Sequence, residues 1–208
     1  MNGIEKEKKN IVIKPIEKNI LVLKIRALEG STLIVHRLDP KTVEDFTIRE
    51  TGKPEIKKFR DFDKEYESCF HYTHDGKYGF PVAGIRGAIL YVAVSLKIPR
   101  AHIKRSVRIL GVLGDDIAEL KYEKLNRRVD NPRRSGISGT PDIRHRPEFF
   151  GWSMVILIEY EPNLISPDQV INLVNRAGSG SGLGEWRPSS PKSPGTHGRF
   201  EVERTKTG

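Results

Sequence analysis

Two basic stretches of this sequence hold side chains suited to binding a polyanion. No acidic residue lies between Asp75 and Asp115, and residues 127–146 contain six arginines and only two aspartates. The planar guanidinium favours bidentate phosphate contacts and stacking on bases. We interpret both stretches as nucleic-acid-binding, with an ordinary solvated face as the alternative. The candidate phosphate-binding residues are Arg86, Lys104, Arg105, Arg127, Arg128, Arg133, Arg134, Arg144 and Arg146.

A glycine-rich segment, "GSGSGLGEWRPSSPKSPGTHGRFEV" (178–202), offers a second set of candidates. Connections within compact domains have a median length of about 4–6 residues, so this one is far longer than a link requires. Its glycines permit positive φ and close approach of backbone N–H groups to phosphate, while Trp186 could stack on a base. Alternatively, Trp186 only covers the sheet and the glycines only form turns. The candidates are Gly182, Gly184, Trp186, Arg187, Lys192 and His197, with Gly195 and Gly198 as further glycines of the loop.

The composition limits the class of protein. The chain has 208 residues, 37% of them hydrophobic, and a formal net charge of +9, which favours polyanionic partners. Cys69 is the only cysteine, so no disulfide can form within the chain and a reducing compartment is expected. No apolar run approaches the ~20 residues that span a bilayer, and no metal-ligand spacing such as CxxC or HExxH occurs. We therefore expect a cytoplasmic protein without a membrane segment, metal or cofactor.

Strands that could position these residues are predicted from apolar and β-branched runs bounded by turn residues. Asp75-Gly76 lies between two short aromatic or apolar runs and predicts a hairpin within 69–80. Residues 41–67 are highly charged and are expected to mix helix and loop. The other predicted strands cover residues 20–28, 32–37, 107–113, 117–122, 153–160 and 199–203.

Two helices are predicted between these strands. Apolar residues recur with helical spacing from Ile85 onward, and Pro99 should stop that helix. The second helix should begin after Ser166 as N-cap, with Gln169 completing a capping box, and should end at Gly178.

The order of these elements predicts an α+β fold. It is the βαββαβ order of a ferredoxin-like or RRM-like core, in which both helices cover one face of an antiparallel sheet. We expect a single domain over residues 19–203, with an N-terminal tail at 1–18 and a C-terminal tail at 204–208. Residues 124–150 form a basic insertion. Because 126–148 lack an apolar pattern, we expect that part to be mobile without a ligand.

Two stretches, "GLGEWRPSSPKSPGTHGRFEV" and "FPVAGIRGAIL", resemble parts of the RAMP superfamily, the RRM-like proteins of CRISPR RNA-guided complexes. The first is similar to the glycine-rich loop before the closing strand, and the second to the start of a helix in the backbone subunit. The resemblance implies that Arg86 contacts guide RNA and that the insertion at 124–150 acts as a thumb between nucleotides. It also implies head-to-tail assembly along the strand, in which each thumb reaches the neighbouring copy.

A second resemblance covers most of residues 20–202. The stretches "LIVHR", "DGKYGFPVAGIRGA", "GTPDIRHRPEFFGWS" and "GEWRP…GRFEV" look like an uncharacterised conserved protein of phages and prophages, which would place the chain in a bacterial host cell. We expect it to bind single-stranded nucleic acid, mainly through the phosphate backbone, with RNA favoured and single-stranded DNA open. One alternative is a metal-independent endoribonuclease of the RAMP superfamily, with His36, His145 or His197 as general base. The other is a phage structural or assembly protein.

Overall fold

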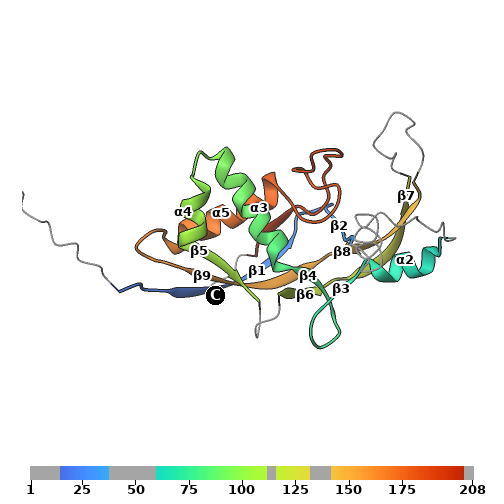
Figure 1. The fold of residues 1–208 in the computed structure, drawn as a ribbon, viewed down its shortest axis with the longest axis horizontal. Coiled ribbons are helices and arrows are strands. Elements are labelled where there is room, and N and C mark those ends of the chain that lie inside the picture. Colours follow the sequence, from blue (N-terminus) through green and yellow to red (C-terminus); the bar gives the residue numbers. More distant parts are fainter. Residues whose placement is uncertain (1–14, 38–59, 112–115, 132–141, 204–208) are drawn as a thin grey trace, which may run out of the picture.

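A computed structural model describes residues 15–37, 60–111, 116–131 and 142–203. Its core confirms the predicted α+β, ferredoxin-like fold (Figure 1). The core elements, in chain order, are β1 (Asn19–Ala27), α3 (Val82–Ser95), β5 (Val107–Leu110), β9 (Ser153–Tyr160), α5 (Pro167–Gly180) and β10 (Phe200–Val202). In the sheet they lie in the order β10, β1, β9, β5, and every neighbouring pair is antiparallel.

The helices cover one face of this sheet (Figure 1). Strand β1 alternates as a half-buried strand should, with Ile25 fully buried and Val22 64% exposed on the opposite face. The predicted apolar stripe of α3, which includes Ile85, Ile89 and Val92, is buried in the core. Both faces of the helix–sheet interface are thus apolar, as hydrophobic burial requires.

The start of α5 is as predicted, but its end is not. Ser166 accepts a hydrogen bond from the Gln169 backbone, and the Gln169 side chain returns one to the Ser166 N–H. The prediction that Gly178 ends this helix is wrong, because α5 continues to Gly180. A Cβ atom at Gly178 would collide with the carbonyl oxygen of Phe200. Gly178 therefore allows the close approach of β10 rather than terminating the helix.

A short helix that was not predicted follows α3. Helix α3 ends at Ser95, and Lys97 takes a positive φ of 60° just before Pro99. Helix α4 (Arg100–Ser106) then begins directly after Pro99, where we expected only a connection to the next strand. Its seven residues are too few for a periodic signal to stand out. It presents Lys104 and Arg105 to solvent.

The sheet extends beyond the core on the side of β9. Strand β6 (Ile117–Lys121) pairs with β9 and with β4 (Tyr78–Pro81), which pairs in turn with β3 (His71–Tyr72). The β3–β4 hairpin confirms the turn predicted at Asp75-Gly76, where Gly76 has a φ of 78°.

The described residues of the basic insertion form a pair of strands, the hairpin, that was not predicted, while the expected mobility of 126–148 without a ligand stays a prediction. Strands β7 (Lys124–Asp130) and β8 (Arg144–Phe150) pair along their whole length, and β2 (Leu33–Ile34) joins β8 to complete a three-stranded sheet. Helix α2 (Phe62–Ser68) packs on β8. This end of the molecule lies far from α4 (Figure 1). Arg133 and Arg134 fall outside the described residues.

No helix among the described residues is long and apolar enough to cross a membrane.

Candidate nucleic-acid interface

The first feature of the hairpin is a buried ion-pair network around Asp130. One carboxylate oxygen of Asp130 accepts from Arg146 Nη2 at 2.7 Å and the other from Arg128 Nε at 2.8 Å. Arg128 and Arg146 are direct partners across the β7–β8 ladder, so one aspartate contacts both. Arg146 is only 1% exposed, and its Nη1 also reaches Glu185 of the glycine-rich segment at 3.4 Å.

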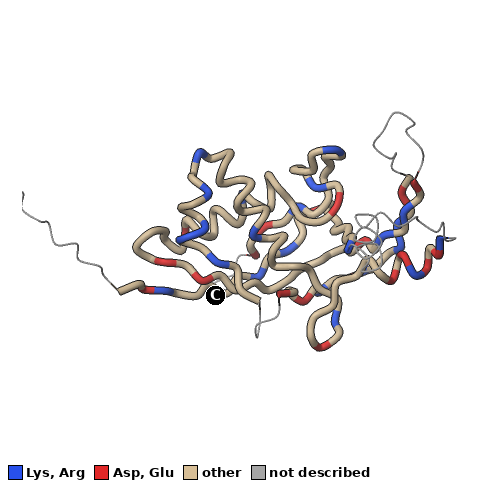
Figure 2. Tube along the Cα trace, viewed as in Figure 1, with Lys and Arg blue, Asp and Glu red and all other residues tan. Residues whose placement is uncertain are grey.

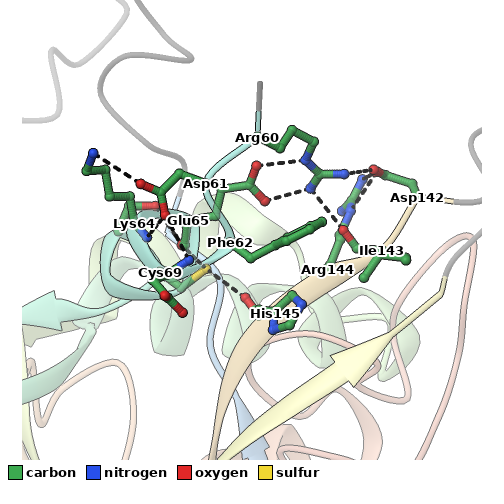
Figure 3. A network of polar contacts seen from close by, with 12 residues as sticks. Arg60, Asp61, Phe62, Lys64, Glu65, Cys69, Asp142, Ile143, Arg144 and His145 are labelled. Carbon is green, nitrogen blue, oxygen red and sulfur yellow. Dashed lines mark hydrogen bonds and ion pairs between the residues drawn. The ribbon is translucent and has the colours of Figure 1, made fainter. Parts of the chain in front are cut away.

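A second network joins α2 to the hairpin (Figure 3). Arg60 donates to both carboxylate oxygens of Glu65, at 2.7 and 2.6 Å, and to Asp142 at 2.9 Å. The hydrogen bonds to Glu65 raise the pKa of Arg60. Arg144 pairs with the same Asp142 through Nη2 at 2.9 Å. Asp142 thus links the residues around α2 to Arg144, the first residue of β8.

Arg127 completes the contact between the hairpin and α2. Its Nη1 pairs with Asp63, its Nη2 donates to the Phe62 carbonyl at 3.0 Å, and its Nε donates to His145 Nδ1 at 2.9 Å. The guanidinium also lies over the Tyr66 ring, 4.9 Å from its centroid. The four described arginines of the hairpin, Arg127, Arg128, Arg144 and Arg146, are therefore all paired with carboxylates. This pairing explains how so basic a segment forms an ordered hairpin.

The glycine-rich loop is held by backbone hydrogen bonds on both sides. Glu185 N–H donates to Ile34 O at 2.9 Å, and Leu183 N–H donates to Gly198 O at 2.9 Å. Gly182, Gly184 and Gly198 have φ values of 69°, 70° and 67°, as expected for glycines chosen for left-handed backbone. Gly195 is not in that region, but a Cβ there would approach the Trp186 carbonyl to 2.5 Å.

Trp186 connects this loop to the hairpin. Its ring centroid lies 5.1 Å from the Arg128 guanidinium and 5.8 Å from that of Arg146. Trp186 also has a φ of 54°, an unusual backbone conformation for a bulky residue. Leu183, at 1% exposure, is the loop residue that joins the hydrophobic core. Trp186 is therefore a half-buried cation–π partner, and Leu183 is the residue that covers the sheet.

Two further loop candidates, Arg187 and Lys192, differ in whether their side chains are free to contact a ligand. Arg187 donates to Gly184 O at 2.8 Å and to Ser189 Oγ at 3.0 Å, so it stabilises the loop. Lys192 is exposed near the middle of the loop.

The three candidate histidines have separate partners. His36 Nδ1 lies 3.9 Å from Glu185, His145 accepts from Arg127, and His197 Nδ1 lies 2.8 Å from Thr32 Oγ1. Burial lowers the pKa of His36 and of His197, and the charge of Arg128 lowers that of His197 further. Across the described residues, no hydrogen bond, ion pair or ring contact joins two of these histidines. Burial also raises the pKa of the Cys69 thiol to about 11, which disfavours a thiolate nucleophile.

The cations on helices α3 and α4 differ from the described arginines of the hairpin because no carboxylate of a described residue pairs with them. Arg86, Lys104 and Arg105 are exposed, and none of them forms an ion pair with another described residue. Figure 2 shows lysine and arginine positions along α3 and α4, in the part of the chain that lacks acidic residues. Lys97 and Arg100 belong to the same stretch without acidic residues and are also exposed, although they were not among the candidate phosphate-binding residues.

The four core strands of the sheet offer no exposed aromatic side chain on which a base could stack. RRM domains stack bases on aromatic side chains of their sheet, but the aromatic residues of β1, β5, β9 and β10 in this chain, Tyr160 and Phe200, are buried. Arginines on the open face are neutralised, as in the pairs Arg26–Glu201 and Arg108–Glu159.

Of the comparisons with known proteins, only the one with solved structures found a match, and that match concerns the fold. No protein-family model matches the chain, and no curated protein does. A solved structure similar to this chain is a chain of the cryo-EM structure of the type III-B Cmr-beta bound to cognate target RNA. The TM-score is 0.53 at 12% identity, with 90% of this chain matching 59% of that one. This chain therefore spans under two thirds of the length of its structural neighbour, and the likeness establishes the shared fold.

Among the described residues, no group of three or more histidine, cysteine, aspartate or glutamate side chains is placed to hold a metal ion.

Proposed function

We propose that this protein binds single-stranded nucleic acid, with RNA favoured, mainly through phosphate contacts. The observation that carries the proposal is a set of exposed cations on α3, α4 and the glycine-rich loop that form no ion pair with another described residue. The set includes Arg86, Lys104, Arg105 and Lys192. The described arginines of the hairpin and of the open sheet face pair with carboxylates, whereas these four cations have no such partner in the part of the chain that the structure describes. Like charges left together repel one another, so such a surface suits a polyanionic partner.

The preference for RNA rests on two likenesses. The loop and the start of α3 resemble the RAMP superfamily, and the similar solved structure contains target RNA. Phosphate contacts carry no base information, so single-stranded DNA of equal length remains a competitor to be measured.

The proposal predicts a strong salt dependence. The logarithm of the association constant should fall linearly with the logarithm of salt concentration, by about 0.7 for each neutralised phosphate of a single strand. Fluorescence anisotropy of labelled RNA and DNA strands between low and physiological salt measures both slopes. An affinity independent of salt would rule out the phosphate-contact mode.

We further propose head-to-tail assembly along the strand. The hairpin projects from the core at the end opposite α4, as an element reaching a neighbouring copy would (Figure 1). A heterologous interface that does not close produces an open filament. The number of copies bound, measured by light scattering, should therefore rise as the strand lengthens from about ten to about sixty nucleotides, well past the roughly 4–16-nucleotide footprint of small single-strand binders. A constant single copy would contradict assembly.

Cleavage is the second candidate activity. His197, Thr32 and Glu148 form a hydrogen-bonded set, with Thr32 Oγ1 2.7 Å from Glu148 Oε1 and 2.8 Å from His197 Nδ1. A metal-independent endoribonuclease would cut the labelled RNA within hours in a chelator-containing buffer, whereas a binding protein leaves it intact. A phage structural or assembly protein would neither bind nor cut the strand.

A further inference from the structure

A groove of about 370 Å³ lies between α3 and the glycine-rich loop. Its volume is at the lower end of the roughly 300–1,000 Å³ of small-molecule sites. On α3 it is lined by Gly84, Gly87, Ala88 and Tyr91, which are spaced along one side of the helix, and on the loop by residues 181–185, 187 and 189. Arg86 is two positions from Gly84 and from Ala88, so it faces another direction and leaves the groove uncharged on the helix side.

The groups lining the groove are polar but almost neutral at physiological pH. Burial lowers the pKa of His71 to about 4 and lowers that of His36, so both imidazoles are uncharged near pH 7. A neutral imidazole offers one hydrogen-bond donor and one acceptor. Tyr91 adds a half-exposed aromatic ring. Glu185 pairs with Arg146, and the Arg187 guanidinium is held by Gly184 O and Ser189 Oγ. Paired donors and acceptors next to a ring suit the edge and face of a nucleobase.

Gly87 is the residue that keeps the groove open. A Cβ at Gly84 would come within 2.7 Å of the Phe80 ring, so packing requires a glycine there. A Cβ at Gly87 would meet nothing within 4 Å, and the φ of Gly87 is not in the left-handed region. Glycine inside a helix is less stable than alanine. Neither packing nor backbone conformation requires a glycine at position 87, and the space beside it is open toward the groove.

We propose that this groove binds one unstacked nucleobase of the bound strand, between Tyr91 of α3 and the glycine-rich loop. The inference rests on the proposed single-strand binding and adds a base contact to a mode that otherwise depends on phosphates. The groove's neutral donors and acceptors make that contact a source of base preference.

Filling the groove tests the inference. The Gly87→Leu variant should bind a single-stranded RNA about tenfold more weakly, because the contact of one base with an aromatic side chain is worth roughly that factor or more. It should bind a strand of abasic ribose phosphates as tightly as the unchanged protein does. Gly87→Ala, which adds one methyl group, should raise the Tm by about 2–4 °C and keep most of the affinity. Ala101→Leu adds similar bulk on exposed α4, outside the groove, and should change neither strand's binding.

The outcomes separate this inference from the proposed function. If the unchanged protein binds neither strand, the proposed function fails and the inference with it. If it binds RNA and the abasic strand equally, or if Gly87→Leu binds RNA as tightly as the unchanged protein, only the base groove is overturned. If a free nucleoside monophosphate saturates the groove with the same Kd as the strand, the site serves a free nucleotide and the inference is also overturned.

Discussion

Replacing Arg146 with alanine should lower the free energy of unfolding by about 3–5 kcal/mol, because removing one partner of a buried ion pair leaves the other charge uncompensated. Arg146 is 1% exposed and pairs with Asp130, which is itself 7% exposed. The substitution also removes the link from β8 to Glu185 and one of the two cations beneath Trp186. Urea denaturation followed by circular dichroism measures the loss.

Two variants control this experiment. Arg144 is 39% exposed and lies two residues away on the same strand, so Arg144→Ala should cost about 1 kcal/mol or less. Arg146→Met replaces the cation with an apolar chain and should recover some of the stability lost by the alanine variant. Equal losses for Arg144→Ala and Arg146→Ala would show that the buried network does not stabilise the hairpin.

Removing four cations that have no ion-pair partner among the described residues should nearly abolish binding at physiological salt. The combined variant Arg86→Ala, Lys104→Ala, Arg105→Ala and Lys192→Ala should lose about 10²–10³-fold in affinity, at about 1 kcal/mol for each contact. Four lost phosphate contacts should also make the salt slope shallower by about 3. The same anisotropy titrations measure both, and the loss should be alike for all base sequences.

A matched control removes the same charge from the other face of the sheet. Lys18, Lys24, Arg26 and Arg108 all pair with glutamates, and replacing them with alanine also removes four positive charges. Because each of those cations already has a carboxylate partner, we expect this variant to keep its salt slope. If both quadruple variants weaken binding equally, the protein attracts nucleic acid by net charge alone and has no defined path for the strand.

Local signals in the sequence were enough for the elements of the core. The apolar stripe of α3, the capping box of α5 and the apolar run of β9 each specify an element within a few consecutive residues, and their order predicted the ferredoxin-like fold. Helix α4 was missed because its seven residues follow a proline that also signals the end of a helix. The hairpin was missed because a β-strand stabilised by ion pairs has no apolar alternation to detect.

The sequence by itself determined the chemistry available to this protein: many guanidinium groups, few carboxylates near α3 and α4, and glycines around one tryptophan. Only the tertiary structure decided which cations have a carboxylate partner among the residues it describes. Asp142 meets Arg60 from 82 residues away, and Glu185 meets Arg146 from 39 residues away, so no local pattern could show that these arginines are neutralised. The groove between α3 and the loop is likewise formed by segments about a hundred residues apart in the sequence. Periodicity reports the contacts that neighbouring residues make, whereas the pairing of charges depends on where folding brings distant side chains together.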